Sequence, residues 1–216
     1  MSRNLVDVHI GVSGRENSEW FSQCLTSLVQ EPVVVHLLDA VPGNIGAMRA
    51  EGFSRGTSEW VACVDPDDYI TPGAFTRALP HLVAGVSAYY TNHSIIIDEQ
   101  AKGSWFHTTS PAVGFAQAKD MHHLTIYRRS AIAPVLHLLD GMQTKPYAPL
   151  NLQAIMTGDV IGVDLIEYHW RNHPGGLHNR AGKTIPRSTQ EWMAAAKKNL
   201  LGPSLATGFI PAGRWP

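Results

Sequence analysis

The chain has 216 residues, of which 44% are hydrophobic and 16% are charged, and its formal net charge is −1. This composition suits one α/β domain with a buried core and excludes a disordered chain. A net charge near zero gives no whole-chain attraction to nucleic acid or to membranes. Both cysteines, Cys24 and Cys63, lie in apolar stretches, so we expect buried thiols and a cytoplasmic setting rather than a disulfide framework. No apolar run reaches the roughly 18 residues of a membrane helix, so we expect no transmembrane segment.

The first half of the chain alternates strand patterns with helix patterns. Apolar and polar residues alternate over Val6–Val12, which predicts a strand, and apolar residues from Trp20 to Val29 recur at helical spacing. Val33–Leu38 is a β-branched run that predicts a buried second strand, ending at Asp39. The elements predicted next are a helix capped by Asn44, a strand over Trp60–Val64, and a helix that begins at Thr71 and Pro72.

The second half has weaker patterns. Ala88–Ile97 and Leu124–Tyr127 predict strands, while Asp98–Gln117 is polar and contains glycine, which indicates loops. The elements predicted after these are a helix near Ile132–Leu139, a helix from Pro149, a strand over Val160–Tyr168, and a helix from the Ser188–Glu191 capping box to Leu200, ended by Gly202 and Pro203. We expect one domain over residues 1–202 and an irregular Pro- and Gly-rich tail over 203–216.

The alternation of strands and helices predicts a mostly parallel central sheet with helices on its faces. Ligands of such sheets bind at the carboxyl ends of the strands. Asp39 and the turn Asp65–Asp68 each follow a predicted strand, so we expect them to meet at that edge of the sheet.

The turn Asp65-Pro66-Asp67-Asp68 places three carboxylates close together. Neighbouring carboxylates raise one another's pKa, and a divalent cation relieves that cost. Mn²⁺ and Mg²⁺ prefer oxygen ligands and often share them with substrate phosphates. The turn by itself is equally compatible with a purely structural role, because Asp-Pro and Asp-Asp are common turn formers.

Three segments follow one another in the order Asn44–Ala50, Gly56–Val61 and Val64–Ile70. They show an Asn-x-Gly helix start, a small-residue turn with Glu and an aromatic residue, and an Asp-x-Asp-Asp strand end. Together with Ser27–Gln30 and Tyr127–Ser130, they resemble the pattern of glycosyltransferase family 2. The resemblance implies a GT-A fold with a nucleotide-sugar-binding half over about 1–98, an acceptor-side half over about 99–187, and a C-terminal helix over 188–202.

The resemblance also implies roles for individual residues. Asp39 would read the base, usually uracil, which favours a UDP-sugar as donor, and Asp65 would bind the ribose. Asp67 and Asp68 would bind Mn²⁺ or Mg²⁺, which stabilises the leaving nucleotide. Arg49 would contact the base or the diphosphate. The alternative for Asp39 is a structural role in a strand-end turn, and the alternative for Arg49 is a place on a solvated helix face. The full set implied around the nucleotide-sugar is Ser13, Arg15, Asp39, Asn44, Arg49, Asp65 and Arg171.

The family's general base has no clear counterpart. Inverting members carry an acid before a helix of the second half, and the equivalent stretch here, Pro146–Leu152, has none. Asp140 is the nearest upstream candidate base, with Asp120 and Asp159 as others, although Asp140 also suits a helix end. A retaining reaction, in which the leaving phosphate takes the acceptor proton, and a non-catalytic nucleotide-sugar-binding module both stay open.

Histidines gather after the last predicted strand. GT-A enzymes often supply a further metal ligand from a C-terminal loop, commonly a histidine near an arginine. Arg171-x-His173 fits this pattern, with His173 as the ligand and Arg171 on the diphosphate. Gly175 and Gly176 would let the loop close over the donor, and His178 is a weaker second ligand.

The acceptor is open among a polysaccharide, a small molecule and a modified DNA base, as for small phage enzymes. The residues considered on the acceptor side are Trp105, Phe106, His122, His123 and Tyr147. The residues considered for DNA phosphates are Arg128, Arg129, Lys145, Arg180, Lys183 and Arg187. Scattered charge that solvates the surface is the favoured alternative for this second group. A nucleotidyltransferase is a less favoured alternative, because no glycine- and lysine-rich triphosphate loop lies near residue 13. The sequence does not determine the oligomeric state.

Overall fold

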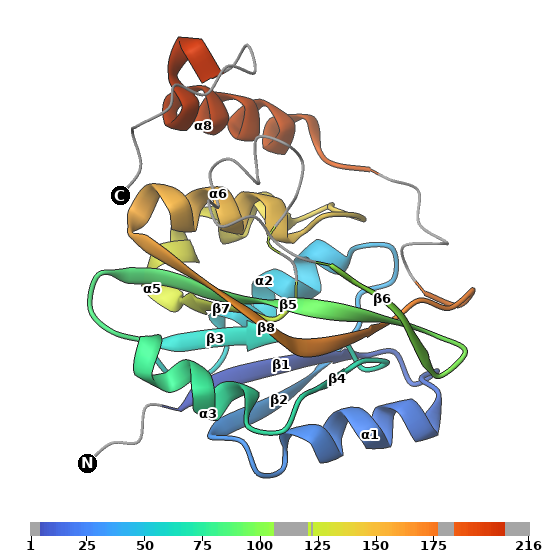
Figure 1. Ribbon diagram of the computed structural model, residues 1–216. Helices are drawn as coiled ribbons and strands as arrows, with labels where there is room; N and C mark the ends of the chain where they lie inside the picture. Colours follow the sequence, from blue (N-terminus) through green and yellow to red (C-terminus); the bar gives the residue numbers. More distant parts are fainter. Residues whose placement is uncertain (1–4, 106–120, 122, 177–183, 206–216) are drawn as a thin grey trace.

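The computed structural model describes residues 5–105, 121, 123–176 and 184–205. Within these ranges, one eight-stranded sheet carries helices on both faces (Figure 1). The strands are β1 (Val6–Val12), β2 (Val33–Asp39), β3 (Trp60–Cys63), β4 (Tyr69–Ile70), β5 (Val86–Ile97), β6 (Gln100–Trp105), β7 (Thr125–Arg128) and β8 (Asp159–Arg171). The α-helices are α1 (Ser18–Leu28), α2 (Ile45–Ser54), α3 (Ala74–Ala78), α5 (Arg129–Ile132), α6 (Tyr147–Thr157) and α8 (Arg187–Leu205), and the 3-10 helices are η1 (Leu79–His81) and η2 (Ala133–Leu139).

The sheet runs in the order β2-β1-β3-β7-β5-β8-β4, with β6 paired to β5. β1 pairs in parallel with both β2 and β3, so the first half of the chain forms the parallel unit that its strand–helix alternation predicts. The second half mixes directions, because β5 pairs in parallel with β8 but antiparallel with β6 and β7. The sheet is therefore parallel where the donor site is expected and mixed elsewhere.

Two apolar layers attach the helices to the sheet. α1 and α3 pack on one face through Cys24, Leu28 and Phe75, while α2, α5, η2 and α6 cover the other face around Phe53 and Tyr127. α8 lies outside α6 and packs against it (Figure 1). Each large apolar side chain buried in these layers contributes about 1.5–3 kcal/mol to stability. Both cysteines are free and buried, as predicted.

The third helix is capped differently from the prediction. The sequence favours a cap at Thr71–Pro72, but α3 starts after Gly73, whose φ of 83° is left-handed. The carboxylate of Glu31 accepts hydrogen bonds from the N–H groups of Gly73, Phe75 and Thr76. This satisfies donors that have no partner within the helix. Glu31 lies too far away in the sequence for a local pattern to reveal the cap.

Two further elements differ from their predictions. The stretch predicted as loops begins with strand β6, because positive φ values at Asp98 and Glu99 turn the chain into a hairpin with β5. The part of that stretch from 106 to 117 lies outside the described residues. The helix predicted near Ile132–Leu139 is mostly 3-10, since Pro134 has no N–H for an α-helical hydrogen bond.

The last two predicted helices are present with shifted ends. α6 starts at Tyr147, two residues before Pro149, whose missing N–H costs nothing in a first turn. α8 starts at Arg187 and continues past Gly202 to Leu205. Within the described ranges, no helix combines the length and the apolar character that crossing a membrane requires.

Candidate active site

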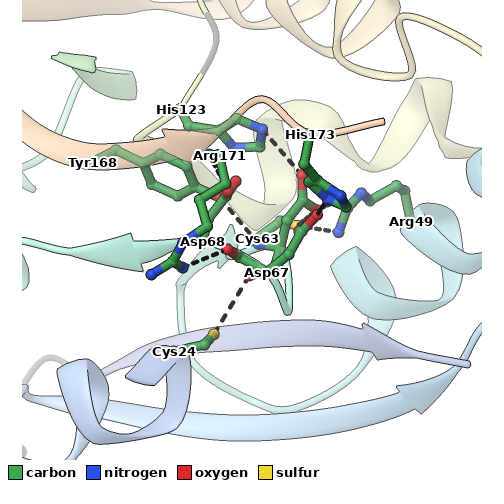
Figure 2. A network of polar contacts seen from close by, with 10 residues as sticks. Cys24, Arg49, Cys63, Asp67, Asp68, His123, Tyr168, Arg171 and His173 are labelled. Atoms are coloured by element: carbon green, nitrogen blue, oxygen red, sulfur yellow. Dashed lines mark hydrogen bonds and ion pairs between the residues drawn. The ribbon is translucent and has the colours of Figure 1, made fainter. Parts of the chain in front are cut away.

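The acidic turn Asp65–Asp68 follows β3 at the carboxyl edge of the sheet. β4 comes next and pairs antiparallel with β8, with Tyr69 opposite His169. This pairing brings the end of β8, with Arg171 and His173, to the acidic turn (Figure 2). Two regions that are more than 100 positions apart in the sequence therefore build one site.

Asp68 is the buried member of the turn, with 1% of its surface exposed. Its carboxylate accepts one hydrogen bond from the Tyr168 hydroxyl and one from the Arg171 backbone N–H, both at 2.7 Å. Burial raises the pKa of Asp68 well above its usual range, the charges of Asp67 and Asp65 raise it further, and the two hydrogen bonds lower it. Asp68 thus ties the acidic turn to β8.

Asp67 is the more accessible carboxylate, with 31% of its side chain exposed. Its Oδ2 lies 2.8 Å from Nε2 of His173, whose side chain is 23% exposed. The His173 ring also meets the Trp20 ring edge-to-face, with centroids 4.8 Å apart. Burial and the charge of Asp65 raise the pKa of Asp67, and the hydrogen bond with His173 lowers it. A carboxylate oxygen and an imidazole nitrogen therefore face each other next to solvent, and the metal-ligand role of both residues stays a prediction.

Arg49 of α2 is buried and forms an ion pair with Asp65. Its guanidinium donates to the Asp65 carboxylate, contacts the sulfur of Cys63 and lies 5.6 Å from the centre of the Tyr147 ring. Burial alone would raise the pKa of Asp65, but Arg49, followed by His123, lowers it far below its usual range. Arg49 therefore does not lie on a solvated helix face, because its buried guanidinium pairs with the partly exposed Asp65 carboxylate.

The described residues offer two sets of donor atoms for a divalent cation. The facing atoms of Asp67 and His173 have a spacing close to the roughly 3 Å between neighbouring ligands of an octahedral ion held at about 2.1 Å. The ligand atoms of Asp65, Asp68 and His123 form the second set and lie within 4.8 Å of one another. In that set both carboxylates already accept strong intramolecular hydrogen bonds. The Asp67–His173 pair is bonded to itself instead and is partly exposed, with 31% and 23% of the two side chains accessible.

The Arg171 guanidinium makes several contacts within the protein. Its guanidinium donates to the Asp67 carbonyl at 2.6 Å and to the side chain of Gln23. It also lies over the rings of Trp20 and Tyr69, at 5.2 and 5.0 Å from their centres. These contacts hold the end of β8 against α1 and the acidic turn. The predicted contact of Arg171 with a diphosphate stays a prediction.

A pocket of about 450 Å³ opens at the carboxyl ends of β1 and β2. Its lining includes Ser13 and Asp39, two of the residues predicted to contact the nucleotide, together with Phe21 and Glu16. The Glu16 carboxylate accepts from both the N–H and the hydroxyl of Ser13, which shapes the first loop. Arg15 is exposed on the same loop but does not line the pocket. The parallel strands thus bring Asp39 and the first loop together.

The side chains of Asn44 and Asp140 are hydrogen-bonded to each other rather than to the acidic turn. Asn44 caps α2 as predicted, accepting from the Ala47 N–H at 3.0 Å. Its amide donates to the Asp140 carboxylate at 2.8 Å and its oxygen accepts from the Gly141 N–H at 3.0 Å. Asp140 therefore has the helix-end position considered for it, and its role as a base is still untested. Asp159, another candidate base, begins β8 at the end of the strand opposite to the site.

Sequence reasoning missed two residues of the site. The Tyr168 hydroxyl donates to Asp68 and accepts from the Asp65 N–H at 3.0 Å. His123 places Nε2 3.4 Å from Asp65 and stacks on Tyr168, with ring centroids 4.4 Å apart. Neither residue belongs to a local motif, because the pairing of distant strands places both. The His-His pair before β7 was the single available signal, and it pointed to the acceptor rather than to the acidic turn.

Most residues considered for the acceptor are committed elsewhere or lie outside the described ranges. Tyr147 is buried, Arg128 pairs with Glu59, and Arg129 pairs with Asp7 at 2.6 Å. Both arginines are therefore paired with carboxylates of the protein itself. The considered residues outside the described ranges are Phe106, Asp120, His122, His178, Arg180 and Lys183, and only the backbone of Trp105 is described.

The fold has counterparts among solved structures. TarS of S. aureus, residues 1–349 in complex with UDP-GlcNAc, matches with a TM-score of 0.69 and 14% identity, over 90% of this chain and 67% of that chain. The UDP complex matches with a TM-score of 0.60 and 13% identity, over 91% and 65%. A longer TarS chain gives a TM-score of 0.63 at 12% identity, over 93% and 43%. No protein-family model and no curated protein matches the chain.

TarS is a GT-A-type glycosyltransferase, and the chain has a GT-A-type fold, as its sequence predicts. The chain spans about two thirds of the 1–349 form of TarS and 43% of the longer chain. At this low identity the likeness establishes the fold alone.

Proposed function

We propose that the chain is a metal-dependent glycosyltransferase that moves a sugar from a nucleotide-sugar, with a UDP-sugar favoured, to an acceptor. The observation that carries the proposal is that a pocket at Asp39 and the Asp67–His173 pair share the carboxyl edge of a GT-A sheet. Two strand spacings, about 10 Å, separate the end of β2 from the end of β3. That span suits a base at one end and a diphosphate at the other. The TarS complexes with UDP-GlcNAc and UDP support the donor class.

Each residue has one task in this proposal. Asp39 accepts a hydrogen bond from the N3–H of uracil, and Asp65, kept ionised by its ion pair, accepts from the ribose hydroxyls. Asp67 and His173 hold Mn²⁺ or Mg²⁺, while buried Asp68 keeps the turn in position. A divalent cation held there supplies positive charge to the diphosphate, which stabilises it as a leaving group without a protein acid.

The destination of the acceptor proton separates two versions of the reaction. An inverting reaction would use Asp140 as the base, and a retaining reaction would use an oxygen of the leaving phosphate. The two versions give opposite anomers, so NMR of the product distinguishes them. Asp140→Asn would stop the first version and leave the second unchanged.

The absence of an acid over Pro146–Leu152, at the start of α6, keeps a second candidate function in view. A non-catalytic nucleotide-sugar-binding module would bind UDP-sugar but would neither hydrolyse nor transfer it. The acceptor stays open among a polysaccharide, a small molecule and a modified DNA base. Binding to DNA that weakens steeply with salt would support the last of these.

Calorimetric titration with UDP, GDP, CDP and ADP, in Mn²⁺ and then in chelator, tests the proposal. We expect UDP to bind most tightly and its binding to be lost with the metal. Failure of all four nucleotides to bind would overturn the proposal. In a parallel titration with UTP, tighter binding of UTP than of UDP would favour a nucleotidyltransferase instead.

A further inference from the structure

The Arg171 guanidinium has a buried nitrogen whose hydrogen-bonding capacity is unused among the described residues. Nη1 donates to the Asp67 carbonyl, and Nη2 donates to the side chain of Gln23. The Arg171 side chain is 2% exposed, and its Nε atom has no hydrogen-bond partner in the part of the chain that the structure describes. A buried N–H group without a partner is costly and rare in folded proteins, so this edge of the guanidinium points to a ligand.

The carboxylate of Glu99 faces this edge. One of its oxygens lies 3.4 Å from Nε of Arg171, and the other lies 3.4 Å from Nη2. These two nitrogens form the fork with which arginine binds two oxygens of a carboxylate or a phosphate at once. Close contacts of this kind are about 2.7–2.9 Å long, so the two groups match in shape but are loosely engaged. Glu99 is also 60% exposed, so its carboxylate can turn away into solvent.

Glu99 occupies a position where glycine is the usual residue. Ile97 pairs with Gln100, so Asp98 and Glu99 form a two-residue turn between β5 and β6. Their φ values are 50° and 57°, the left-handed conformation that such a turn requires and that favours glycine at its second position. Another residue keeps this conformation when its surroundings hold it there. The contact with Arg171 gives a reason for a glutamate at position 99.

The Arg171 fork lies next to the proposed cation site. Asp67, whose carbonyl accepts from Arg171, also faces His173. The Trp20 ring contacts the His173 ring, with centroids 4.8 Å apart, and the Arg171 guanidinium, which lies 5.2 Å from the centre of the Trp20 ring. A diphosphate has enough oxygens to contact a cation at Asp67 and the fork of Arg171 at the same time. The diphosphate is therefore the ligand class that suits this edge.

We propose that Glu99 holds the place of the donor's diphosphate on Arg171 while the site is empty, and that the diphosphate displaces it on binding. The inference rests on the proposed function and adds a residue that sets donor affinity. On displacement, the Arg171 fork binds two phosphate oxygens and the Glu99 carboxylate turns to solvent. Because the ion pair must break first, Glu99 weakens donor binding, and its return favours release of the nucleoside diphosphate after transfer.

Calorimetric titration with UDP and with inorganic pyrophosphate, both in Mg²⁺, tests the role of Glu99. Glu99→Gln keeps the size of the side chain and removes its charge. Both ligands should bind this variant about fivefold more tightly, on the order of one broken surface ion pair. Asp98→Asn is the matched control, because it removes a neighbouring exposed charge of the same turn that solvent screens. Its affinities should stay within about twofold of the wild type. Thermal unfolding would verify that both variants are folded.

The two ligands separate failure of this role from failure of the proposed function. Equal or weaker binding of pyrophosphate by Glu99→Gln, or an equal gain in Asp98→Asn, would overturn the role of Glu99. A gain with UDP alone would overturn it too, because the diphosphate is the group that displaces Glu99. A gain with pyrophosphate but no preference for UDP over GDP, CDP and ADP would support the role and overturn the UDP-sugar assignment. Binding of neither ligand to any variant would contradict both.

Discussion

Asp67 and Asp68 are adjacent in the acidic turn, yet their surroundings are opposite. Asp68 is buried and accepts two hydrogen bonds from β8, while Asp67 is partly exposed and faces His173. A buried carboxylate with its hydrogen bonds satisfied fixes the geometry around it. A carboxylate beside solvent can exchange its partner for a ligand. The acids of one turn therefore differ in burial, and under the proposed function the buried acid holds the turn while the exposed one binds the cation.

The largest expected effect is on activity and follows from Asp67→Ala. This change removes a carboxylate oxygen from the proposed cation site, so metal-dependent release of UDP from a UDP-sugar should fall to background. The free energy of unfolding should stay within about 1 kcal/mol of the wild type. Glu191→Ala, which removes an exposed carboxylate on α8, is the control and should retain turnover. Unchanged turnover in Asp67→Ala would show that the comparison assigns the ligand role to the wrong acid.

The next effect is on stability and follows from Asp68→Asn. An amide presents an N–H group where the carboxylate accepts from Tyr168 or Arg171, so one buried donor loses its partner. We expect the free energy of unfolding to fall by about 2–3 kcal/mol in urea titration. Tyr168→Phe removes the hydrogen bonds to Asp68 and from the Asp65 N–H, and the double variant should cost less than the sum, because both changes break the Tyr168–Asp68 hydrogen bond. If Asp68→Asn and Asp67→Ala lowered the free energy of unfolding equally little, the proposed contrast between the two acids would be wrong.

The smallest effect concerns a buried polar group that has no hydrogen bond among the described residues. Both ring nitrogens of His9 on β1 lack a hydrogen-bond partner there, and the ring packs edge-to-face against Phe53. Burial, and then the charge of Arg49, lowers the pKa of His9 well below its usual value. Below about pH 6.5 the unfolded chain therefore binds a proton that the folded chain does not. Stability should fall as the pH decreases below that value, by up to about 1.4 kcal/mol per pH unit.

Urea unfolding between about pH 7.5 and pH 5, a range that spans the ordinary histidine pKa, measures how the free energy of unfolding changes with pH. His9→Leu should flatten it, whereas His137→Leu, which changes an exposed histidine, should not. Equal slopes in the two variants would show that His9 binds its proton in the folded state as readily as in the unfolded chain, so that its burial without a hydrogen bond does not affect stability against pH.

Much of the first half was predictable because its signals are local. The alternation over Val6–Val12 and the cap at Asn44 act within a few residues, and both are observed. The acidic turn was predictable because a buried strand ends just before it. Arg49 was harder to assign, since the sequence allows both a solvated and a ligand-facing position, and the structure buries it against Asp65.

The second half resisted prediction because its contacts are distant. The hairpin of β5 and β6 depends on two left-handed residues, and the cap of α3 comes from Glu31. His123 reaches Asp65 because the sheet order places β7 beside β3, a pairing that no short motif records.

The sequence by itself determined the α/β class, the GT-A resemblance, the acidic turn, and Asp39 and His173 as candidates, because periodicity and short motifs depend on neighbouring residues. Only the tertiary structure decided that Asp68 is buried, that Asp67 faces His173, and that Arg49 and Arg171 are held inside. These outcomes depend on which strands pair and how deeply each side chain is buried, and burial is a property of the whole fold.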